Sequence, residues 1–148
     1  MAFHFTLEAV LRYRQSLEDR ELLRLQTMLT RRAALLSEVE QLHRTAFDLQ
    51  QETKQAMLQQ PTPAIEIHFA MARLHGLDRQ QQRLGEQLRE LEGAIVEQRS
   101  RYQQQRRNCE VLESLRAGQL RDYRLTQRRR EQAQLDELHL LRRRAISH

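Results

Sequence analysis

Apolar residues recur along this chain with the spacing of long amphipathic helices. In the first half, two rows of a seven-residue repeat are mostly apolar: Leu25, Val39 and Ala46 form one row, and Met28, Leu35, Leu42, Leu49 and Ala56 form the other. Arg32 and Thr53 interrupt the first row. Polar residues at such positions cost stability but help to fix the register of a coiled coil.

One break divides the pattern. Segment 59–63 carries Pro61 and Pro63, and a straight helix does not tolerate two prolines so close together. We therefore expect a first helix over about residues 5–58, a turn over about 59–63, and a second helix over about 64–145.

A second and longer heptad series follows the break. Its two rows are Leu74, Gln81, Leu88, Ile95, Tyr102 and Cys109, and Leu77, Leu84, Leu91, Gln98, Gln105 and Leu112. Two such series on either side of a short turn favour intramolecular antiparallel pairing. The predicted fold is all-α, a two-helix antiparallel coiled-coil hairpin that forms a single domain over residues 1–148.

The turn also sets an expected register. With its centre near Thr62, residue i faces roughly residue 123 minus i, which places Leu42 opposite Gln81 and Leu7 opposite Arg116. The first helix then runs out near Gln119. Residues from Leu120 onward are predicted to form a C-terminal helical overhang with no internal partner.

Composition agrees with long helices and locates the charge. The chain is 30% charged and 5% aromatic, with four Gly and no Trp, and its Leu, Ala, Glu, Gln and Arg are strong helix formers. The net charge is +5, and residues 118–148 hold eight arginines against four carboxylates, a net +4. The overhang therefore favours an acidic partner. A basic coiled coil that binds nucleic acid is an alternative. The net charge of zero over residues 1–60 argues against it.

The sequence offers little for catalysis. Cys109, the single cysteine, falls on the apolar row, and His68 and His75 have no third ligand to complete a metal site. No phosphate-binding loop or pair of catalytic carboxylates is present. No stretch approaches the length and apolarity of a membrane span, and the N-terminus lacks the pattern of a signal peptide. We expect no enzyme, cofactor, metal or small-molecule substrate, and a cytoplasmic location.

Two regions are candidates for contact with partners. Phe3 and Phe5 precede the heptads, so they either anchor in a partner or pack on the second helix. Beside the turn, alternating Ile65, Ile67, Phe69 and Met71 cannot all face one seam of a helix. Some of them must be exposed and mark an interface, unless an irregular turn folds back over them.

Both ends of the chain resemble one family. The opening Phe3-x-Phe5-x-Leu7-x-x-Val10-Leu11-x-x-Arg14 resembles the start of the flagellar FliJ proteins, central-stalk components of the flagellar type III export apparatus. The end is similar to the family's C-terminal pattern: Arg130-Glu131-Gln132-x-x-Leu135-Asp136-Glu137-Leu138, followed by Arg142-Arg143-Arg144.

The resemblance implies a stalk similar in fold to the γ stalk of rotary ATP synthases. Its implied partners are the hexameric flagellar export ATPase, the cytoplasmic domain of the membrane export gate, and export chaperones. The location would be cytoplasmic, peripheral at the inner membrane and associated with it indirectly. The equivalent stalk of a virulence secretion system stays open as an alternative.

The expected contact residues fall into two sets. The ATPase set combines the family-pattern positions with basic residues of the overhang: Phe3, Phe5, Leu7, Val10, Leu11, Arg14, Arg124, Arg128, Arg130, Glu131, Leu135, Asp136 and Leu138. The gate set is Ile65, Ile67, Phe69 and Met71.

Overall fold

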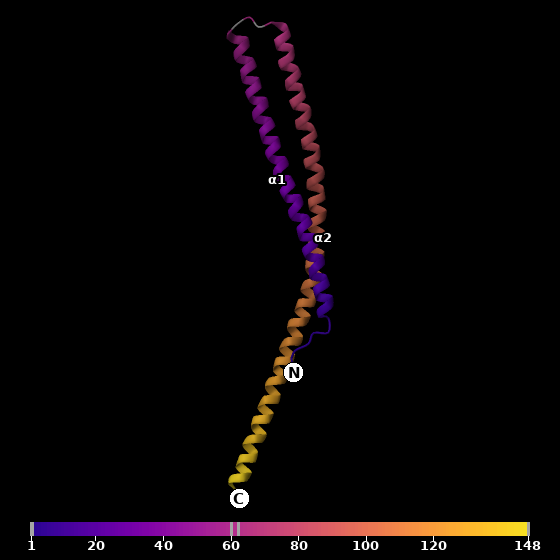
Figure 1. Cartoon of the computed structure of the whole chain (residues 1–148), viewed down its shortest axis with the longest axis vertical. Coiled ribbons are helices and arrows are strands. Elements are labelled where there is room, and N and C mark those ends of the chain that lie inside the picture. The colour runs from indigo at the N-terminus through magenta and orange to yellow at the C-terminus, as the bar shows by residue number, and fades with distance from the viewer. Residues whose placement is uncertain (1, 60, 62, 148) are drawn as a thin grey trace. The chain divides into compact units, whose positions relative to one another are not determined.

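The computed structural model describes residues 2–59, 61 and 63–147, and consists there of two long helices. Helix α1 covers Glu8–Gln59 and helix α2 covers Ala64–Ile146 (Figure 1). They run antiparallel, which confirms the predicted helical hairpin. Residues 60 and 62, in the segment predicted as the turn, lie outside the described residues.

The helix boundaries differ slightly from the expected ones. Helix α1 begins at Glu8 rather than at residue 5, because the backbone N–H of Glu8 donates to the carbonyl of Phe5 at 3.1 Å in a turn that precedes the helix. Helix α2 begins directly after Pro63, whose carbonyl accepts hydrogen bonds from the N–H groups of Glu66 and Ile67. Proline is well suited to the start of a helix, where its missing N–H removes no intrahelical bond.

The chain divides into two compact units. One unit, Arg20–Tyr102, holds the turn and the adjoining parts of both helices, which lie side by side (Figure 1). The other unit combines residues 1–19 with residues 103–148, so that the start of the chain is packed on the second half of α2.

Cross-helix contacts give the register within each unit. In the turn-containing unit, Gln81 Nε2 lies 3.1 Å from His43 Nδ1, and Arg32 pairs with Glu92 at 3.5 Å. In the other unit, Arg116 pairs with Glu8 at 3.1 Å, one residue away from the predicted contact with Leu7. The pairs agree with the expected register to within about one residue.

The core is a linear seam along the predicted heptad rows. The buried apolar residues among those described are Phe5, Leu11, Leu25, Leu35, Ile95 and Cys109. Two polar residues, Glu18 and Gln98, are buried in the same seam. Gln98 donates to the backbone carbonyl of Glu21 at 3.1 Å and also to the Glu21 carboxylate, so its amide nitrogen is satisfied.

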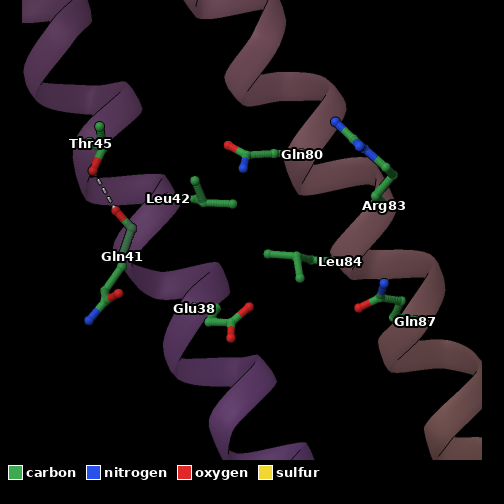
Figure 2. Close-up of a pocket in the computed structure, with 8 residues that line it drawn as sticks. All are labelled: Glu38, Gln41, Leu42, Thr45, Gln80, Arg83, Leu84 and Gln87. Carbon is green, nitrogen blue, oxygen red and sulfur yellow. Dashed lines mark hydrogen bonds between the residues drawn. The ribbon is translucent and has the colours of Figure 1, made fainter.

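The seam opens toward the turn. Between α1 and α2, Leu42 and Leu84 point toward each other across a hollow of about 410 Å³ rather than interlocking (Figure 2). Thr45, on the rim, donates its hydroxyl to the carbonyl of Gln41 and so does not bridge the two helices. From Leu42 to the turn, no described seam residue of α1 is fully buried.

The register can be tested by crosslinking. In a Cys109→Ala background, we expect Leu42→Cys and Gln81→Cys to be joined within one chain by a short bismaleimide, because packed helix axes lie about 8–10 Å apart. A direct disulfide requires closer Cα atoms, and we expect it to form less efficiently across the hollow. The readout is the mass of the crosslinked monomer.

A matched control pairs Leu42→Cys with Val96→Cys, which lies fifteen positions further along α2, or about 22 Å. Crosslinks that form only between chains, or equally well in this control, would contradict the intramolecular register.

Candidate functional site

The N-terminal segment packs on the molecule's own second helix. Phe5 is 3% exposed, and the Phe3 ring lies 5.6 Å from the Tyr123 ring at a tilt of 52°. The guanidinium carbon of Arg116 lies 5.8 Å from the centre of the Phe3 ring, within the range of a cation–π contact. Of the two readings of Phe3 and Phe5, the structure therefore supports packing on the second helix.

Ion pairs reinforce this packing. Arg116 reaches both Phe3 and the carboxylate of Glu8, and Arg106 Nη1 donates to Glu18 Oε1 at 3.1 Å. The pKa of Arg106 is raised above its ordinary value, chiefly because Glu18 accepts this hydrogen bond and adds an opposite charge. Glu18 occupies a seam position and is almost wholly buried, so Arg106 supplies the partner that a buried carboxylate requires.

Cys109 lies fully buried beside this ion pair. Burial, which disfavours the charged thiolate, is the main cause that raises the pKa of Cys109 to about 11, and the nearby Glu18 adds to it. The thiol is therefore protonated at neutral pH and behaves as a small apolar side chain, as the heptad position indicated.

The N-terminal motif residues thus divide into core and surface. Phe5 and Leu11, which were expected to contact a partner, are buried within the chain in this structure. Leu7 and Val10 are exposed and Arg14 is half-buried, so these three remain accessible.

The overhang begins later than the sequence indicated. Residues of α2 remain partly covered as far as Gln127, whereas the expected limit was near Gln119. The reason is that residues 2–5 are not helical. An extended residue spans about 3.3 Å and a helical one 1.5 Å, so a short N-terminal segment covers a long stretch of α2.

From Arg128 to Ser147, every residue is exposed. The predicted contact residues of this stretch are therefore all accessible, namely Arg128, Arg130, Glu131, Leu135, Asp136 and Leu138. Arg124, just before it, is exposed as well. Leu135 and Leu138 are each more than half exposed.

The apolar cluster beside the turn is also accessible. Ile65, Phe69 and Met71 are about 60% exposed, whereas Ile67 turns toward α1 and is half-buried. This division agrees with the expectation that alternating residues cannot share one helix face. Met57 and Leu58 at the end of α1 are exposed too, although no periodic signal singled them out.

A shallow groove of about 200 Å³ adjoins this cluster. Its floor is mostly apolar, with Leu49, Ala56, Ile67 and Ala70, and the carboxylates of Glu52 and Glu66 stand beside it. Such a surface can accept an apolar side chain or a helix from a partner.

Other kinds of site are not seen. In residues 2–59, 61 and 63–147, no three His, Cys, Asp or Glu side chains are placed to hold a metal ion. Over the same residues, neither helix contains a segment apolar enough to span a bilayer.

Comparison with known proteins adds one finding. The family model described as "Flagellar FliJ protein" matches residues 3–145, which is nearly the whole chain. No curated protein and no solved structure matches the chain.

Burial of Phe5 gives a stability test. Phe5→Ala removes a fully packed ring and should lower the free energy of unfolding by about 3 kcal/mol. Leu7→Ala, at an exposed position two residues away, should change it by less than about 0.5 kcal/mol. Urea denaturation followed by circular dichroism measures both. Equal effects of the two substitutions would show that Phe5 is not part of the core in solution.

Proposed function

Because the chain belongs to the flagellar FliJ family, we propose that it is a non-enzymatic stalk that binds the hexameric export ATPase and links it to the export gate. The family implies a stalk protein of flagellar type III export. The observation that carries the finer proposal is the presence of two accessible surfaces, one in each unit, on a helical hairpin whose heptad rows form the seam.

The ATPase is assigned to the unit that holds both termini. In this unit the exposed end of α2 carries most of the net positive charge of the chain, and a ring pore lined with acidic groups would attract it. Leu7, Val10 and Arg14 supply further accessible positions, whereas Phe5 and Leu11 act indirectly by holding the N-terminal segment on α2.

The gate is assigned to the turn. Ile65, Phe69 and Met71 form a small exposed apolar cluster, and Ile67 lines the groove next to it. Exposed apolar clusters of this kind commonly mark protein interfaces. The protein would then act in the cytoplasm, peripheral to the inner membrane, and associate with the membrane only through the gate. Binding of export chaperones is a further part of the proposal, to which no residues are assigned.

The chain itself should not hydrolyse ATP. We expect the purified protein to release no phosphate, and to raise the turnover of its cognate export ATPase or promote assembly of the hexamer. A coupled phosphate-release assay with and without the ATPase measures the first effect, and light scattering measures the second. Hydrolysis that persists through successive purification steps would overturn the non-enzymatic role.

The assignment of the two surfaces predicts two variants, each of which weakens binding to one partner and leaves binding to the other unchanged. Replacing Arg124, Arg128 and Arg130 with Glu should weaken ATPase binding at least about tenfold, because charge reversal opposes an acidic pore. Binding to the cytoplasmic domain of the gate should be unchanged. Replacing Ile65 and Phe69 with Ser should have the opposite pattern.

Both variants alter exposed residues, so helicity by circular dichroism should remain near that of the unaltered protein. If the arginine variant lost gate binding and kept ATPase stimulation, the two surfaces would have to be exchanged.

A further inference from the structure

The exposed end of α2 carries its arginines in two groups. Residues 128–130 and residues 142–144 are each three consecutive arginines, and we call them the first and second triplet. All six side chains are exposed. In the described part of the chain, no ion pair engages any of them. Six arginines against three carboxylates give residues 128–147 a net charge of +3.

The triplets are spaced by two heptads. Arg128 and Arg142 are fourteen positions apart, which on a helix is about 21 Å. Consecutive residues turn by about 100°, so each triplet forms an arc of about 200° around the axis. After two heptads the second arc has nearly the same orientation as the first. The result is two arcs of positive charge, one above the other.

Between the two arcs the helix carries leucines and carboxylates and no arginine. Leu135, Leu138 and Leu141 follow each other at three-residue steps, and all are at least half exposed. At about 100° per residue, Leu138 and Leu141 point to the side that both arcs leave open, whereas Leu135 points between the directions of Arg128 and Arg142. Glu131, Asp136 and Glu137 lie at intermediate heights. The helix therefore presents groups for contact around its whole circumference.

Self-association does not suit this pattern. In a parallel in-register pair each triplet would meet its own copy. In an antiparallel pair with Leu138 opposite its own copy, the first triplet would lie about one helical turn from the second triplet of the other copy. Both arrangements bring three positive charges close to three others, which is unfavourable at a helix–helix contact.

An anionic bilayer or a nucleic acid fits no better. A helix that lies in a membrane interface needs one uninterrupted apolar side, but Glu131 and Arg142 fall between the directions of Leu135 and Leu138. A continuous ladder of phosphates would also meet the three carboxylates between the triplets.

We propose that residues 128–147 bind inside a protein channel that carries carboxylates at two levels about 21 Å apart, with an apolar wall between them. This inference rests on the proposed function, because the pore of the hexameric ATPase is the channel. In such a ring each level repeats its carboxylates around the axis, so an arc of arginines meets some of them at any rotation. Guanidinium groups suit this contact because each can pair with a carboxylate through two hydrogen bonds.

The test uses the full-length chain and its purified cognate ATPase. Reversing either triplet to Glu should weaken binding at least about tenfold, whereas replacing either triplet with Lys should weaken it much less, because the charge is kept. Affinity measured over a range of salt concentrations should fall less steeply with salt for each reversed triplet than for the unaltered chain.

A helical insertion tests the spacing itself. Seven neutral helix-forming residues inserted after Ala133 move the second triplet by about 10 Å and keep its orientation. We expect this variant to bind the ATPase as weakly as the variant whose second triplet is replaced with Glu. Combining the insertion with that replacement should cause no further loss of affinity. The same seven residues inserted after Ala145, beyond both triplets, form the matched control and should leave affinity unchanged.

The outcomes separate the two proposals. If the unaltered chain binds the ATPase and the insertion after Ala133 has no effect, the partner presents a diffuse acidic surface and the two-level channel is wrong, while the stalk function stands. If replacing the second triplet with Glu lowers the affinity of the insertion variant for the ATPase by the same factor as it lowers that of the unaltered chain, the spacing is likewise irrelevant. If the unaltered chain neither binds nor stimulates the ATPase, the proposed function itself fails. Tighter binding to a single-stranded oligonucleotide or to phosphatidylserine vesicles than to the ATPase would also overturn the inference.

Discussion

Two helices that pack along a single line can bury only a narrow stripe of each, and this constraint governs the structure. The interface between two helices is only a narrow strip, so even its most buried leucines lie next to exposed residues. The core residues accordingly lie at heptad intervals, from Leu11 and Leu25 on α1 to Ile95 and Cys109 on α2. Every other surface of the two helices is available to water or to partners.

The narrow seam explains how buried polar residues are tolerated. Glu18 lies in the same heptad row as Leu11 and Leu25 but is within reach of Arg106, whose long side chain leaves the seam and keeps its charge near solvent. Gln98 finds both a backbone carbonyl and a carboxylate at Glu21. Breaking such pairs is costly, and a slip of the helices by one turn would break them, so they favour one register over its neighbours.

Much of this architecture could be predicted from the sequence, because heptad spacing and a pair of prolines are local signals. The rows that contain Leu35 and Ile95 are the rows that are buried. The later start of α1 was not predictable in the same way. Whether Phe3 and Phe5 pack internally depends on where Arg116 and Tyr123 lie in three dimensions, and no periodicity encodes contacts between residues so distant in sequence. For the same reason the heptads placed the end of the covered region at Gln119, whereas the extended segment carries it to Gln127.

The exposed end of α2 has a thermodynamic consequence. A peptide of about twenty residues is only marginally helical alone in water, because the first turn fixes several backbone dihedrals for a single hydrogen bond. Here the first turn of α2 forms far upstream, and the segment after Arg128 only propagates a helix that the seam has already nucleated. A partner that receives this segment therefore meets chain with much of its backbone already ordered, and loses less conformational entropy than it would on capturing a disordered tail.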